Sequence, residues 1–212
     1  MSGAPGLQIV HVVDDDQSVR TALARLLRAA RYEVRTYASA REFLERPADE
    51  GAGCLVLDLS MPGISGLDLQ EALVRDPAAP PVVFLTGHGD IPASVRAMKA
   101  GAVDFLTKPV DRERLLAAIE VALVRDVERR RRREHVASLE ARFAALTPRE
   151  QEVFDLLVTG MLNKQVGTAL GTTERTVKAH RAQVVRKLGV ESVAEMVRVA
   201  IALGRVPEDA SG

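Results

Sequence analysis

The pattern of hydrophobic and polar positions changes near residue 125. Before it, short apolar runs alternate with longer segments in which residues such as Leu23 and Leu27 recur at helical spacing. This alternation predicts a parallel sheet covered by helices. The predicted strands are Gln8–Val13, Glu33–Tyr37, Gly53–Leu57, Val82–Thr86 and Asp104–Thr107. The predicted helices are Gln17–Ala30, Ser39–Leu44, Ser65–Asp76, Ile91–Ala100 and one from Asp111 onward.

Five strand-and-helix units in succession predict an α/β domain with a five-stranded parallel, flavodoxin-like (βα)5 fold. In doubly wound sheets, ligands bind beyond the carboxyl ends of the strands, where the strand order reverses. We therefore expect the residues that follow the first, third, fourth and fifth strands to lie together.

The residues after 125 predict helices only. From Arg125 to about Ala145 the sequence has no Gly or Pro, which predicts a helical linker. Thr147 and Pro148 then form a good N-cap and first-turn pair. We divide the chain into an α/β domain at 1–124, the linker at 125–145 and an all-α four-helix domain at 146–212. Its predicted helices are Arg149–Val158, Asn163–Leu170, Glu174–Leu188 and Ser192 to about Leu203.

The linker contains the basic run Arg129–Arg133. Two interpretations of this run stay open. It contacts nucleic acid, or it forms a solvated helix face, which is the commoner role of such runs.

Composition agrees with two packed domains, because 212 residues with 47% hydrophobic and 27% charged residues allow each domain its own core. No apolar run approaches the roughly 20 residues that span a bilayer, and we see no signal sequence. We therefore expect a cytoplasmic protein without membrane contact. The single cysteine, Cys54, lies in an apolar run and predicts a buried thiol without a redox role.

The formal net charge is +0, but the two parts of the chain differ. Up to Val124, Asp and Glu outnumber Lys and Arg, and from Arg125 onward the balance is reversed. An acidic first part suits cation binding, and a basic second part suits a polyanion.

Carboxylates follow two of the predicted strands. Asp14 and Asp15 end the first strand, and Asp58 ends the third. Converging carboxylates repel one another, and a cation would relieve this repulsion. An all-oxygen ligand set with open water positions suits Mg²⁺. The sequence therefore predicts a magnesium site of the kind used in phosphoryl transfer.

Two more strand ends carry groups that suit a phosphoryl site. Thr86 follows the fourth strand and Lys108 the fifth, and a hydroxyl and an ammonium can both bind phosphoryl oxygens. Each residue also has an ordinary structural explanation: a helix N-cap for the paired acids, a structural threonine, a surface lysine. Their joint occurrence, in order, at four strand ends favours the functional interpretation.

The segments HVVDDD, LVLDLSMPGISG, FLTGHGD and AMKAGAVDFLTKP resemble receiver domains of response regulators, especially those of the FixJ type. The resemblance implies that Asp58 accepts a phosphoryl group from a sensor histidine kinase. It also implies that Asp15, Asp58 and the backbone carbonyl of Ser60 bind Mg²⁺ directly, with Asp14 acting largely through water.

The same resemblance gives Thr86 and Lys108 contacts to the phosphoryl oxygens, with a cis bond between Lys108 and Pro109. It implies a switch in which Thr86 moves and the ring of Phe105 turns inward, although Phe105 is equally well explained as a core aromatic. The segment Ile91–Thr107 is the dimer face that the resemblance implies on activation.

A helix-turn-helix pattern occupies the all-α part. The turn Gly171-Thr172-Thr173 separates two short predicted helices, and Thr173 can N-cap the second. Between Asn163 and Leu188 the sequence has six Lys and Arg but one acid, Glu174. Basic residues on the outer face of such a helix can bind DNA phosphates and base edges.

The stretch LTPREQEVFDLLVTGMLNKQVGTALGTTERTVKAHRAQVVRKLGV is similar to the LuxR/NarL-type helix-turn-helix domain. The similarity makes Lys178 the best candidate for a base or phosphate contact, while His180 is either a reader or a packed surface histidine. Gly167 departs from the family, which usually has alanine there, and glycine costs a helix about 1 kcal/mol. The remaining expected DNA contacts are Lys164, Thr173, Arg175, Thr176 and Arg181.

The sequence thus predicts a two-component response regulator, not an enzyme, in which phosphorylation of Asp58 controls DNA binding and transcription. Its expected partners are a sensor histidine kinase, promoter DNA, a second copy of the chain when phosphorylated, and RNA polymerase as a further candidate. One alternative is a phosphate-independent DNA-binding protein that uses the first domain only to dimerise. A phosphatase or phosphotransferase is disfavoured, because no second nucleophile stands at a strand end.

Overall fold

The computed structural model describes residues 8–47, 53–87 and 91–205. The chain forms two compact units, Met1–Arg130 and Arg131–Gly212. Among the described helices, none is long and apolar enough to cross a membrane.

The first unit is built on a five-stranded parallel sheet with the order β2-β1-β3-β4-β5. Strand order reverses beside β1, so β1 and β3 are neighbours although β2 lies between them in sequence. This is the switch point at which ligands bind in such sheets. The strands are β1 (Ile9–Val13), β2 (Glu33–Tyr37), β3 (Gly53–Asp58), β4 (Val82–Thr86) and β5 (Asp104–Thr107).

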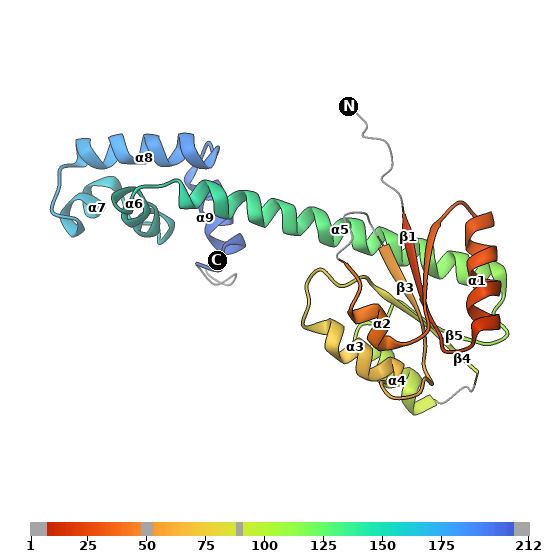
Figure 1. Ribbon diagram of the computed structural model, residues 1–212. Helices are drawn as coiled ribbons and strands as arrows, with labels where there is room; N and C mark the ends of the chain where they lie inside the picture. Colours follow the sequence, from red (N-terminus) through yellow and green to blue (C-terminus); the bar gives the residue numbers. More distant parts are fainter. Residues whose placement is uncertain (1–7, 48–52, 88–90, 206–212) are drawn as a thin grey trace. The chain divides into compact units, whose positions relative to one another are not determined.

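Helices cover both faces of the sheet (Figure 1). One core lies under α1 and α5 and includes Leu27 and Ile119; the other lies under α2, α3 and α4 and includes Phe43 and Leu69. Successive strand residues contribute to opposite cores, which explains why the strands are apolar throughout. The helices of this layer are α1 (Gln17–Ala29), α2 (Ala40–Leu44), α3 (Gly66–Val74) and α4 (Ile91–Lys99).

Helix α5 (Arg112–Ala144) is continuous over 33 residues, so the predicted linker continues the last helix of the first unit without a break. Asp126 lies beyond the expected end of the first domain at Val124, yet it is fully buried in the first unit. Its carboxylate accepts hydrogen bonds from the Gly53 amide at 2.9 Å and from Arg130 Nε at 2.7 Å. This long-range contact extends the first unit to Arg130.

Every helix or strand described in the second unit, over residues 131–205, is a helix. Its core contains Phe154, Val184 and Met196, together with Leu139 and Phe143 from the end of α5. The rings of Phe143 and Phe154 meet edge to face, with centroids 5.2 Å apart. The helices after α5 are α6 (Pro148–Val158), α7 (Asn163–Ala169), α8 (Glu174–Leu188) and α9 (Val193–Ala202).

The predicted fold class is confirmed: a five-stranded parallel α/β domain is followed by helices in the part of the chain that the structure describes, up to residue 205. The strands and helices lie within one or two residues of their expected bounds, apart from the joining of the linker to α5.

Candidate functional site

The carboxyl ends of β1, β3 and β5 bring two acids and one lysine together. Lys108 Nζ lies 2.6 Å from Asp14 Oδ2 and 2.6 Å from Asp58 Oδ1. Both carboxylates are buried, and Asp58 is only 5% exposed. The expected meeting of the strand ends is therefore present, and a cation of the chain already neutralises part of the acidic charge.

Backbone and side-chain hydrogen bonds fix the two acids in place. Asp58 Oδ2 accepts from the Ser60 amide at 2.9 Å, and Asp14 Oδ1 accepts from the Asp16 amide at 2.9 Å. Arg20 Nη1 donates to the Asp14 carbonyl oxygen at 2.7 Å. Arg20 was not among the residues predicted from the sequence, although its position one turn into α1, six residues after Asp14, is compatible with such a contact.

The charges shift the proton affinities of the pocket. Burial raises the pKa of Asp58 above its ordinary value, although the hydrogen bond from Lys108 opposes the rise. Burial by itself lowers the pKa of Lys108, but its hydrogen bonds to Asp14 and Asp58 outweigh that effect, and the net pKa is raised. Lys108 is therefore a firmly protonated counter-charge.

The donor set around the pocket suits a hard divalent cation. Asp15 is exposed next to buried Asp14, and Ser60 is exposed two residues after Asp58. These residues offer carboxylate and carbonyl oxygens, which Mg²⁺ prefers, and exposure leaves room for water ligands. Within the described ranges, however, no three His, Cys, Asp or Glu residues are already grouped as a metal site. The oxygen chemistry of these residues therefore fits Mg²⁺.

Two further predicted features of the pocket, Thr86 and the Lys108–Pro109 bond, lie at strand ends. Thr86 is buried at the end of β4, and the Lys108–Pro109 bond is cis, as expected. Phe105 is partly buried, with its ring centroid 6.0 Å from that of Phe84. The last three residues of the FLTGHGD segment, 88–90, lie outside the described residues.

The loop after Asp58 needs a glycine at its end. Gly66 begins α3, and a Cβ added there would overlap the Asp58 carbonyl oxygen. The close approach of α3 to β3 therefore requires glycine at this position.

Helices α7 and α8 and the turn between them form the expected helix-turn-helix. Thr173 is the N-cap of α8, and its hydroxyl oxygen accepts from the Thr176 amide at 3.2 Å. Lys178 is exposed and pairs with Glu174 at 2.8 Å. Lys164, Thr173 and Arg175 are also exposed, whereas Thr176, His180 and Arg181 are partly buried.

Steric crowding explains why position 167 is a glycine. It is buried in α7, and a Cβ there would lie 3.0 Å from the Thr172 carbonyl oxygen. The Thr172 amide in turn donates to the Gly167 carbonyl at 2.8 Å. The glycine that departs from the family pattern thus lets the turn pack closely on α7.

An ion pair joins the first turn of α6 to the last turn of α8. Lys187 Nζ donates to Glu150 Oε2 at 2.6 Å, and Glu150 also accepts from the Thr147 amide in a capping box. These bonds, that of Lys187 foremost, lower the pKa of Glu150. Helix α8 is therefore anchored to α6 at its carboxyl end.

Comparisons with known proteins identify a family for each of the two units. Residues 10–120 match the family model of the response regulator receiver domain, and residues 144–200 match that of the bacterial regulatory proteins of the luxR family. Nodulation protein W of Bradyrhizobium diazoefficiens is 47% identical over 196 residues, which cover 92% of this chain and 86% of that protein. The transcriptional regulatory protein FixJ of Azorhizobium caulinodans is 42% identical over 94% of this chain and 95% of its own.

Solved structures show the same likeness over more than nine tenths of the chain. The response regulator StyR is 50% identical, with a TM-score of 0.78, over 92% of this chain and 98% of its own. Full-length FixJ from B. japonicum is 35% identical, with a TM-score of 0.55, over 96% of this chain and all (100%) of its own.

The fold and the two family matches define a regulatory transcription factor rather than an enzyme, with an α/β receiver domain followed by a helix-turn-helix domain. The chain belongs to the two-component response regulators that combine a receiver domain with a LuxR-type DNA-binding domain.

Proposed function

We propose that Asp58 accepts a phosphoryl group from the phosphohistidine of a sensor histidine kinase. A carboxylate oxygen of Asp58 forms the new P–O bond while the P–N bond breaks and the imidazole leaves. The single observation that supports this most strongly is the Lys108 ammonium held 2.6 Å from Asp58 Oδ1, where it can stabilise phosphoryl oxygens. We expect Thr86, at the neighbouring strand end, to bind another of these oxygens.

Asp15, Asp58 and the backbone carbonyl of Ser60 would hold Mg²⁺, with Asp14 acting through water. The bound cation would supply positive charge that screens the acids from the incoming phosphate. The exposure of Asp15 and Ser60 beside two buried acids supports this assignment.

The second unit reads promoter DNA with the outer face of α8. Exposed Lys178 and Arg175 stand on this helix within two turns of its N-terminus, where reading helices contact base edges. Lys164, Thr173, Thr176, His180 and Arg181 complete the proposed contact surface.

Phosphorylation would act through movement of Thr86 and Phe105 and would favour a homodimer. Exposed Ile91, Val95 and Met98 form an apolar stripe on α4, within the segment expected to pair. We place the protein in the cytoplasm, with RNA polymerase as a further candidate partner. The alternative is a protein that binds DNA independently of phosphorylation and uses its first domain only to dimerise. This alternative does not explain why Asp14, Lys108 and Asp58 are assembled into one group.

Replacing Lys178 with Ala should weaken specific DNA binding by about 1–3 kcal/mol. The matched control is Arg198→Ala, because Arg198 is an exposed cation of the same unit that also pairs with a glutamate one turn away. Fluorescence anisotropy of a duplex selected by the wild-type protein measures both. An equal loss of affinity in the two variants would contradict the proposal that α8 contacts the DNA bases.

A further inference from the structure

Arg149 connects α6 to the helix-turn-helix. From the first turn of α6, Arg149 Nη1 lies 2.8 Å from Glu152 Oε2, and Arg149 Nη2 donates to the Leu170 carbonyl oxygen at 2.5 Å. Leu170 is the C-cap of α7, where carbonyl groups lack partners within the helix. A charged donor makes this a strong hydrogen bond across 21 residues.

The Leu170 carbonyl immediately precedes the turn that leads to α8. The N-cap of α8, Thr173, follows three residues later, and Arg175 and Lys178 lie within the next two turns. From the other side, the Thr172 amide bonds to Gly167 of α7. The turn is thus held by α7 at Thr172 and by α6 at Leu170.

We infer that Arg149 is a positioning residue for DNA reading: it fixes the start of α8 through the Leu170 carbonyl without being a base-reading residue. The inference rests on the proposed DNA reading by α8. The planar guanidinium donates hydrogen bonds to Glu152 and to the Leu170 carbonyl oxygen from two different nitrogens. A lysine has a single ammonium group and would restore only part of this pair of hydrogen bonds.

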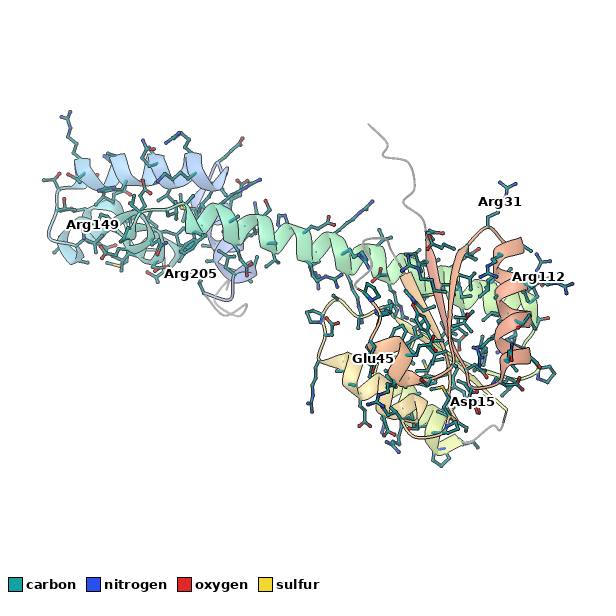
Figure 2. The ribbon with its side chains drawn as sticks, in the orientation of Figure 1. Asp15, Arg31, Glu45, Arg112, Arg149 and Arg205 are labelled. Atoms are coloured by element: carbon teal, nitrogen blue, oxygen red, sulfur yellow. The ribbon has the colours of Figure 1, made fainter. Side chains whose placement is uncertain are left out.

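Arg205 provides a matched control. Its side chain also binds to α6, through two hydrogen bonds to Asp155 at 3.0 and 2.8 Å. Its guanidinium lies 4.4 Å from the ring centroid of Phe143. The side chains of Arg149 and Arg205 have the same exposed fraction, 37%. Figure 2 labels both arginines in this unit. Arg205 is bonded to α6 but makes no bond to the turn.

The test compares full-length wild type, Arg149→Gln, Arg149→Lys and Arg205→Gln. In the presence of Mg²⁺ and acetyl phosphate, anisotropy measures the affinity for a duplex enriched from a random pool by the wild type and for a scrambled duplex, each at several salt concentrations. Thermal unfolding is followed in parallel.

Arg149→Gln should lose about tenfold in affinity for the selected duplex. Its affinity for the scrambled duplex and the salt dependence of its DNA binding should not change. Arg149→Lys should recover part of the loss. Arg205→Gln should keep the wild-type affinity ratio although it unfolds at a lower temperature.

Two results would overturn the inference. An unchanged affinity ratio in both Arg149 variants would leave this arginine a purely structural role. A parallel loss on both duplexes, with the salt slope reduced by about 0.9, would make it a direct phosphate contact instead. If the wild type itself binds no duplex, the proposed function fails first, which distinguishes that failure from the other two.

Discussion

Asp58→Asn should take up no phosphoryl group from acetyl phosphate and Mg²⁺, whereas the wild type should gain the mass of one. The amide lacks the carboxylate nucleophile, while the Lys108–Asp14 ion pair of 2.6 Å remains to hold the pocket together. Intact-protein mass spectrometry measures the difference. Removal of Mg²⁺ with a chelator should suppress uptake by the wild type as well.

The control for this variant is Asp16→Asn. Asp16 lies two residues from Asp14, but it is exposed and caps α1 through the Ser18 amide at 2.7 Å. Asparagine also caps helices well, so this variant should keep both its fold and its phosphoryl uptake. Phosphoryl uptake by Asp58→Asn would show that another residue is the acceptor.

Phe154→Ala should unfold the second unit and abolish DNA binding, but leave phosphoryl uptake intact. Phe154 is fully buried in that core, and truncation of such a ring costs about 3–5 kcal/mol. A loss of this size is a large part of the 5–15 kcal/mol that stabilises a typical domain. Circular dichroism and thermal unfolding report the loss, and mass spectrometry reports the phosphoryl uptake.

The reciprocal control is Phe84→Ala. Phe84 is equally buried, but in the core of the first unit beside Phe105. This variant should lose phosphoryl uptake while the second unit stays folded. If either substitution unfolds both units together, the two units are not independent folding units.

Local patterns were sufficient to predict the strands and helices. The apolar runs of β1 and β3 are buried on both faces, so they stand out from the amphipathic helices around them. The carboxyl ends of parallel strands lie at one edge of the sheet. The meeting of Asp14, Asp58 and Lys108 could therefore be predicted from their positions directly after strands in the sequence. Figure 2 shows Asp15 at this edge of the sheet.

Contacts between distant residues could not be predicted in this way. The Asp126 carboxylate bonds to Gly53 across 73 residues, and no periodicity reveals such a pair. For the same reason, the hydrogen bond from Arg149 to the Leu170 carbonyl could not be predicted from the sequence pattern. The close packing at Gly167 was missed because helix propensity describes only the helix itself, not the turn packed against it.

Phosphorylation of Asp58 in the first unit should control DNA binding by the second unit. Fluorescence anisotropy follows the binding of a selected duplex by the full chain, with and without Mg²⁺ and acetyl phosphate, for the wild type and Asp58→Asn. We predict that the phosphodonor tightens salt-sensitive binding by the wild type and leaves Asp58→Asn unchanged. Equal affinity of both proteins under all conditions would contradict control of DNA binding by phosphorylation of Asp58.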